Sequence, residues 1–310
     1  MKCMHKILFA ATLFLGLASW TNAQKELQFE AGAFVGGSNY LGEIGGFDDP
    51  RASVLDVNLS QTSPTFGGFF RVGLHPRIGI KTSVNFVQIK SEDAASINPA
   101  RRARNLNFRN RMVEFGVLAD FVCASIGDIT NEGSTNPSFT TSLDFTVHAG
   151  VYGVLHNPMA RITYDPNNVW EDRYYELRPL RTEGQIEEYA RLIAAIPVGF
   201  GVQVNVRNTW KFGLEASYRT TFTDYLDDIS GQYADPSALD PLAQALSSQS
   251  NEFVIALIND PSSGSVANHQ YSEAGTYRGN PATNDGYGTI QFTVSKVLKS
   301  VSRSGRSSGF

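Results

Sequence analysis

The segment WKFGLEASYR, residues 210–219, places an apolar side chain at every second position. The apolar and charged positions alternate, with Trp210, Phe212, Leu214, Ala216 and Tyr218 on one parity and Lys211, Glu215 and Arg219 on the other. Successive side chains of a β-strand point to opposite faces, so this pattern predicts a strand with one apolar and one charged face.

The same alternation recurs in seven further segments. They lie at about residues 27–35, 66–74, 78–86, 113–121, 139–155, 192–204 and 290–294. Within these spans every charged side chain lies opposite the apolar face. A basic side chain facing the bilayer midplane costs about 2–4 kcal/mol, so this segregation is typical of strands whose apolar side faces lipid.

The eight segments predict an all-β fold, an eight-stranded antiparallel transmembrane β-barrel with long extracellular loops, over residues 24–298. Tight turns are expected at residues 75–77 and 207–208. Outer-membrane barrels have short periplasmic turns and longer outer loops, and an even strand number places both termini in the periplasm. The long connections are 36–64, 90–106, 156–190 and 223–286, with a moderately long periplasmic one at 124–138.

The N-terminal segment is typical of a secretory signal peptide. Lys2 and Lys6 precede an apolar run, and Ala23 ends a stretch suited to cleavage, which predicts a signal peptide over residues 1–23. Without it the chain has 24 basic and 30 acidic residues, a net charge of −6 that argues against nucleic acid as a partner. Residues 299–310, rich in Ser and Gly, are expected to form a flexible periplasmic tail.

The charged parity points into the predicted barrel. It carries five acids and four bases: Glu30, Glu114, Asp120, Asp144 and Glu215 with Arg71, Lys81, Lys211 and Arg219. Side chains can fill the interior of an eight-stranded barrel, so the prediction is a closed lumen held by an ion-pair network. A conducting pore is disfavoured, because open aqueous channels occur in barrels of about 16 strands.

Enzymatic chemistry has one candidate. His148 and Asp144 share the inward face of one segment, and a carboxylate beside a histidine is an arrangement that could orient a general base. A hydrogen-bonded lumen histidine is the simpler interpretation, and no serine motif marks a nucleophile. The sequence therefore predicts no catalytic residue, no cofactor and no metal site.

The outer loops carry clustered charges. Arg101, Arg102 and Arg104 crowd the second loop, where arginines suit either lipid phosphates or neighbouring acids. Asp224, Asp227 and Asp228 in the last loop could hold calcium. Pairing with the arginines across the rim is the favoured interpretation, because the loops must be closed over the lumen.

Several loop motifs resemble the outer-membrane barrel family that includes PorG, a component of the type IX secretion and gliding machinery of Bacteroidota. They are DYLDDISGQY at 224–233, RGNP at 278–281, ND at 284–285, SNYLGE at 38–43 and ARRARNL at 100–106. The resemblance covers the mature chain and marks Asp224, Tyr225, Asp227, Asp228, Gly231, Arg278, Gly279 and Asn280 as family-motif loop residues.

The resemblance implies a non-enzymatic scaffold that contacts a periplasmic ring of lipoprotein and soluble subunits. The predicted function is therefore a structural component of the type IX secretion apparatus in the outer membrane, with membrane lipid and ring subunits as partners. Two alternatives stay open: a lipid-modifying enzyme based on His148 and Asp144, and a small surface or adhesion barrel acting through its outer loops.

Overall fold

The computed structural model describes residues 26–45, 59–127, 141–163, 165, 167–250, 255–256 and 272–302. The predicted signal peptide lies outside these residues. Among them, eight long strands form the barrel: β1 (Glu26–Leu41), β2 (Ser63–His75), β3 (Ile78–Glu92), β4 (Asn107–Ile126), β5 (Thr141–Leu155), β8 (Leu192–Val206), β9 (Trp210–Thr221) and β10 (Gly286–Ser302).

The eight strands pair antiparallel in one closed sheet. Their order is β3-β2-β1-β10-β9-β8-β5-β4, and pairing between β3 and β4 joins the two ends of this row. The first and last strands of the barrel are neighbours, with Leu41 opposite Gly286 and Glu26 opposite Ser302. The predicted fold class, an eight-stranded antiparallel barrel, is confirmed.

The two faces of the wall separate as the alternation predicts. Large apolar side chains point outward on all eight strands and are well exposed, including Val35, Phe66, Val84, Phe115, Val151, Phe200, Leu214 and Ile290. The charged positions of the same spans point inward and are mostly buried. Among the described residues, no helix has the length and apolar character required to cross a membrane.

β3 and β4 extend well beyond their alternating segments, and in these extensions, near one end of the barrel, the polarity of the alternation inverts. Beyond Phe86 in β3, the buried inward positions are Val87 and Ile89, while Gln88 and Lys90 face outward. Phe108 and Met112 are likewise buried in β4. The alternation predicts that each strand ends where outward positions stop being apolar. The structure shows that β3 and β4 continue past this point, with polar side chains facing outward.

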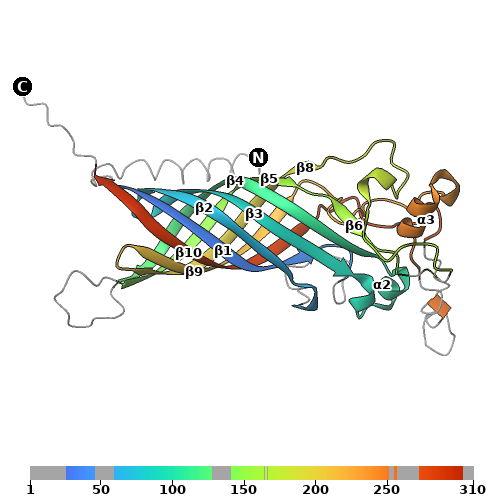
Figure 1. Ribbon diagram of the computed structural model, residues 1–310, viewed down its shortest axis with the longest axis horizontal. Coiled ribbons are helices and arrows are strands. Elements are labelled where there is room, and N and C mark those ends of the chain that lie inside the picture. The colour runs from blue at the N-terminus through green and yellow to red at the C-terminus, as the bar shows by residue number, and fades with distance from the viewer. Residues whose placement is uncertain are drawn as a thin grey trace, which may run out of the picture.

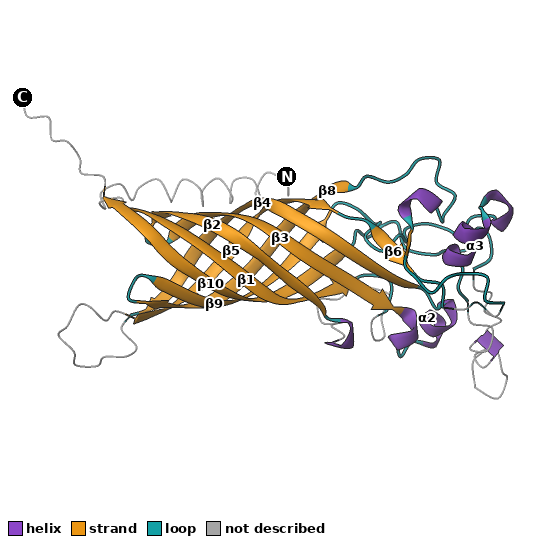
Figure 2. Ribbon diagram, in the orientation of Figure 1, coloured by secondary structure: helices purple, strands orange, loops and turns teal. Residues whose placement is uncertain are grey.

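The remaining elements gather at this same end, which we call the cap end; the opposite end is the turn end (Figures 1 and 2). They are η1 (Leu59–Gln61), η2 (Asp93–Ala95), α2 (Pro99–Arg104), β6 (Pro158–Ala160), β7 (Tyr175–Glu176), η4 (Arg178–Leu180), η5 (Pro236–Ala238) and α3 (Pro241–Ser247). Helices α2 and α3 each begin with a proline after a capping side chain, Asn98 for α2 and Asp240 for α3.

The turn end contains two tight connections, at residues 76–77 and 207–209. β10 runs to Ser302 and pairs with β1 there, so residues 299–302 belong to the barrel rather than to the predicted tail. The rest of that tail and most of the predicted connection at 124–138 lie outside the described residues.

Candidate functional site

The lumen near the turn end is crossed by linked ion pairs. The Glu30 carboxylate accepts hydrogen bonds from Lys211 Nζ (2.7 Å) and the Ser295 hydroxyl (2.6 Å), and Arg71 Nη1 lies 3.6 Å from it. Arg71 also donates through Nε and Nη2 to both oxygens of Asp120, at 2.7–3.1 Å. Five strands are thereby tied through one polar cluster.

Two further pairs continue this network toward the cap end. Lys81 Nζ donates to both oxygens of Glu215, at 2.9 and 3.0 Å. Arg219 Nε lies 3.3 Å from Glu114, which also accepts hydrogen bonds from Tyr287 and Asn85. Each acid thus lies against a base from a strand far away in the sequence.

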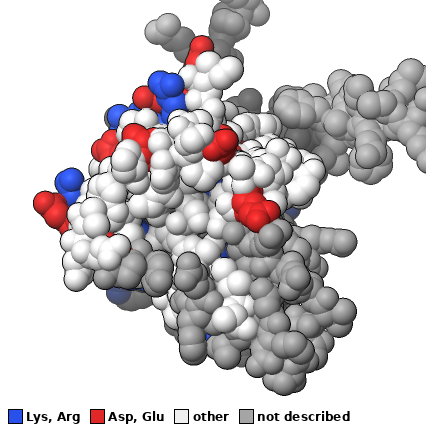
Figure 3. Space-filling model, turned by 90° about the vertical axis from the view of Figure 1, so that its right-hand side faces the viewer, with Lys and Arg blue, Asp and Glu red and all other residues white. Residues whose placement is uncertain are grey.

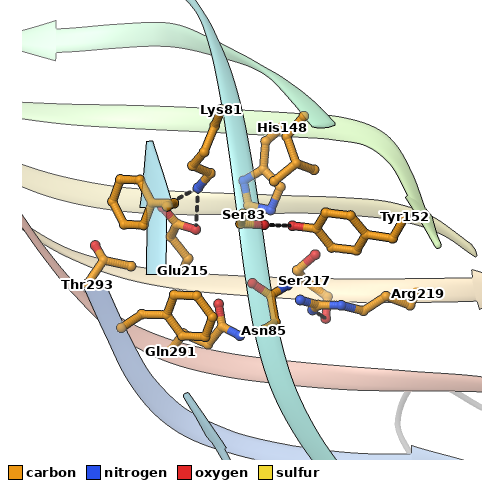
Figure 4. A pocket seen from close by; sticks show the side chains of 13 residues that line it. Lys81, Ser83, Asn85, His148, Tyr152, Glu215, Ser217, Arg219, Gln291 and Thr293 are labelled. Carbon is orange, nitrogen blue, oxygen red and sulfur yellow. Dashed lines mark hydrogen bonds and ion pairs between the residues drawn. The ribbon is translucent and has the colours of Figure 1, made fainter. Parts of the chain in front are cut away.

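Two small chambers lie in the described part of the lumen. These chambers, of about 20 Å³ each, lie on either side of the Lys81–Glu215 pair. Both are lined by this pair together with Phe69 and His148. Figure 4 shows the polar side chains that line one of these chambers, including Lys81, His148 and Glu215. A water molecule needs about 10–15 Å³ of such space, so each chamber has room for about one water.

His148 and Asp144 do not meet. Asp144 accepts from the Ser125 hydroxyl (2.6 Å) and from Gln203 (3.4 Å), whereas His148 lines the chambers beside Lys81 and Glu215. Residues four apart on a strand are separated by about 13 Å, because each residue advances the strand by about 3.3 Å. Sharing a face was therefore insufficient for a catalytic pair. Among the described residues Asp144 has these hydrogen bonds and no ion pair, in contrast to the ion pair that the sequence predicted.

The cap end of the lumen is closed by the last loop. Leu226 and Ile229 are fully buried and pack among inward-facing apolar residues of the strands, including Val87, Met112 and Tyr287. The Asn110 side chain donates to the Leu226 carbonyl at 2.8 Å. We call Leu226 and Ile229 the apolar plug. The inverted polarity of the strand ends forms the socket that this plug fills.

Arg278 fixes the loops above the plug. Its Nη1 donates to the Thr182 hydroxyl (3.0 Å), to Glu183 (3.2 Å) and to the Asp228 carbonyl (2.5 Å), and lies 3.6 Å from the Asp228 carboxylate. Glu183 in turn accepts from the backbone amides of Ser230 and Gly231. The side chain of Arg278 is only 2 % exposed, so these charges meet away from solvent.

A second arginine joins the other loops. Arg104 donates to both oxygens of Asp93 (2.7 and 3.0 Å), to the Glu43 carbonyl (2.8 Å) and to the Arg278 carbonyl (3.0 Å). Of the three predicted loop arginines, Arg104 thus pairs with a neighbouring acid. Arg101 is buried in α2, and Arg102 is exposed beside it.

The remaining family-motif residues surround these two arginines. Glu43 accepts from the Asn280 amide (2.7 Å) and lies so close to Gly279 that a Cβ there would have no room. Tyr225 stacks on Tyr189, with ring centroids 4.7 Å apart. The motif residues therefore hold the loops against one another.

The aspartates of the last loop do not form the calcium site considered from sequence. Asp228 faces Arg278, while Asp227 accepts from the Tyr40 hydroxyl (2.7 Å) and the Ile229 amide (3.0 Å). Within the described part of the chain, no cluster of three or more acids, histidines or cysteines is arranged to hold a metal ion.

Tyr40 also lies 2.5 Å from the Asp285 carboxyl, so one phenol oxygen contacts two carboxyl groups. The phenol has one proton to donate, and the second short contact requires a proton on a carboxyl. Burial raises the pKa of Asp227 to about 8 and that of Asp285 well above its usual value, each helped by a neighbouring carboxylate. Burial likewise raises the pKa of Glu43 and of Asp224 to about 7.

The cap is expected to loosen as the pH rises from 6 to 9. Its buried carboxyls carry protons that the unfolded chain, with carboxyl pKa values near 4, has already lost, so stability falls as pH rises through the folded pKa values. Hydrogen exchange of residues 222–233, referred to intrinsic rates, should show protection at pH 6 that is reduced at pH 9, with barrel strands unchanged. Asp227→Asn should flatten this dependence; greater protection at pH 9 would contradict it.

Several residues of the cap had no role predicted from sequence. Tyr40, Glu43 and Asp285 lie within the quoted motifs, which marked them without indicating their contacts. Glu183 lies in an irregular segment and Asp93 begins the single turn η2, and neither segment has a periodicity that shows which way a side chain points. The partners of Glu183 come from a loop distant in sequence, whereas Asp93 pairs with Arg104 of its own loop.

Residues 6–243 match a family model described as Domain of unknown function (DUF6089). The chain belongs to this family. No curated protein matches the DUF6089 chain. The assignment to the PorG-like family stays a prediction.

Solved structures similar to the DUF6089 chain include three other proteins. Neisserial surface protein A is 9 % identical, with 88 % of this chain and 97 % of that one covered and a TM-score of 0.31. The attachment invasion locus protein Ail of Yersinia pestis, in complex with the heparin analogue sucrose octasulfate, is 10 % identical, with 88 % and 99 % covered and a TM-score of 0.29. CarO2 of Acinetobacter baumannii is 12 % identical, with 87 % and 98 % covered and a TM-score of 0.24. Likenesses this weak carry no argument about function.

Proposed function

We propose that this chain is a non-enzymatic barrel of the outer membrane, a closed anchor that presents an ordered cap as a scaffold. The observation that carries the proposal is the apolar belt around the outward face. It includes side chains from all eight strands, such as Phe200 (65 % exposed) and Val151 (61 % exposed). A contiguous apolar surface much larger than a few hundred Å² marks a membrane or protein contact, and a belt that closes around a cylinder suits lipid.

The limits of the belt support this proposal. Gln88 and Arg111 form an outward polar pair near the cap end (3.2 Å), and Lys296 lies over Trp210 near the turn end (5.5 Å). On β4, the outward positions from Arg111 to Cys123 extend for about 40 Å along the strand, or about 30 Å along the axis at the 45° tilt of transmembrane strands. This height is close to the apolar band of about 25 Å in outer-membrane barrels.

Orientation and the absence of catalysis are parts of the same proposal. Short turns face the periplasm in outer-membrane barrels, so the cap end is assigned to the cell exterior, and the first and last strand termini to the periplasm. The water-sized chambers and the separation of His148 from Asp144 favour a structural role over the lipid-modifying alternative. On the part of the cap face that Figure 3 draws in colour, acidic and basic side chains are interleaved, which does not favour a polyanionic ligand there.

The type IX secretion role is the finer form of this proposal, and it rests on the motif resemblance. Purification of the full chain in mild detergent from its own cells, with the copurifying proteins identified, tests it. Ring subunits are the expected partners, and a periplasmic partner must be among them for this role to stand. A surface or adhesion role would instead give partners that bind the cap.

An outward charge in the middle of the belt is expected to prevent assembly in membranes. Leu214 is 57 % exposed and faces outward beside Val202 and Phe292. Leu214→Arg should cost about 2–4 kcal/mol at the bilayer midplane, and Leu214→Met is the matched control. The measurement is flotation of refolded protein with lipid vesicles. Wild-type protein that stays monomeric and soluble in plain buffer without detergent would end the proposal.

A further inference from the structure

The outer wall of the barrel has a recess of about 240 Å³ where β8, β9, β10 and β1 lie side by side, nearer the cap end. Its lining is uncharged and mostly apolar, and includes Val198, Phe200, Ala216, Tyr218, Gly288 and Ile290. The recess therefore lies within a belt that includes many large exposed side chains.

The recess follows from small residues in the strand register. Tyr218 lies opposite Gly288, and Ala216 lies opposite Ile290, so small and large outward side chains alternate across β9 and β10. The ring of Tyr218 leans over Gly286, where it leaves no room for a Cβ. The space above Gly288 stays open, because a Cβ there would meet only Leu41, at 3.7 Å.

We infer that this recess binds one acyl chain of a membrane lipid. The inference rests on the proposed membrane location, which brings hydrocarbon to every part of the belt. A water molecule needs about 10–15 Å³ of such space, as in the lumen chambers, so a recess of about 240 Å³ is large enough for a short run of methylene groups. The absence of charge in the lining argues against a headgroup inside it.

The polar edge of the recess determines the direction in which the acyl chain lies. Asn39, paired in register with Gly288, accepts a hydrogen bond from the Thr62 hydroxyl (3.1 Å), and the Tyr218 hydroxyl lies over Gly286. Both polar groups are on the cap side, so the ester end of the lipid lies there and the chain extends toward the turn end. A second copy of this protein would present the side chains of a whole strand face. Such a face fits a narrow recess less well than a single acyl chain does.

The test uses the full chain in phosphatidylethanolamine vesicles that contain a phosphatidylethanolamine with a diazirine in its acyl chain. After illumination, labelled peptides are mapped by mass spectrometry. We expect labelling of β8, β9 and β10 around the recess to exceed that of the outward faces of the other strands. Gly288→Leu should fill the recess and reduce this labelling to the level of the other strands.

The matched control is Gly68→Leu, because Gly68 faces outward on β2 with only a backbone oxygen, 3.5 Å away, near a Cβ position. This variant should leave the labelling of the recess unchanged. Equal labelling of all strands in the wild type, or protein–protein cross-links at Gly288, would overturn the inference while leaving the membrane proposal intact. Lack of label on every strand would instead contradict the membrane location itself.

Discussion

Replacing Arg278 with Ala is expected to open the cap while the barrel stays folded. The change leaves Glu183 and the Asp228 carboxylate facing each other without their shared cation, 4 % and 0 % exposed. Breaking a buried ion pair by removing one partner costs about 3–5 kcal/mol. Hydrogen exchange should therefore become faster at residues 182–184 and 228–233, with strand amides in the belt unaffected.

The control for this experiment is Arg102→Ala, which removes an exposed arginine of the neighbouring helix α2. It should leave cap protection as in the wild type, because an exposed charged side chain contributes little to stability. Equal protection in the Arg278→Ala variant and the wild type would show that the cap is held by the apolar plug and does not depend on its central arginine.

Glu215→Ala is expected to weaken the barrel itself. Glu215 holds Lys81 by two hydrogen bonds in the middle of the lumen, and the Lys81 side chain is only 8 % exposed. Without Glu215, the Lys81 ammonium group is buried beside Phe69 and has lost its acid partner. The expected loss in the free energy of unfolding is again about 3–5 kcal/mol. The unfolding temperature in detergent, read from heat-dependent electrophoretic migration, should fall clearly.

The double variant Lys81→Met/Glu215→Leu separates this cause from a general loss of packing. An apolar pair of similar volume often matches a buried ion pair in stability, so the double variant should recover much of the lost unfolding temperature. A temperature unchanged by Glu215→Ala alone would contradict the role of the lumen network in stability.

The barrel could be predicted from sequence because its interior and exterior differ at every residue of a strand. Alternation shows that Lys81 and Glu215 both face the lumen, because the direction of a side chain follows from its position within its own strand. It does not show that they meet, because 134 residues separate them and the meeting depends on the register of four strand pairings between β3 and β9. Asp144 and His148 looked like a pair for a different reason: they share one face of β5, but four residues of strand separate them by about 13 Å.

The cap could not be predicted in this way. Arg278 binds Glu183 of another loop as well as Asp228 of its own, and irregular backbone has no period that fixes the direction of a side chain. The inverted ends of β3 and β4 did carry a signal. Val87 and Ile89 continue the alternation with opposite polarity, which indicates strands that leave the hydrocarbon and receive a plug.

The neighbouring positions of β1 and β10 have a consequence for biogenesis. A chain that lacks residues beyond Gly286 has two unpaired strand edges, each able to template aggregation. Closure requires β10, because the partner of β1 is the last barrel strand in the sequence, and contacts so distant along the chain form slowly. Until β10 pairs with β1 both edges stay open, and a factor that covers them would protect the unclosed barrel from aggregation.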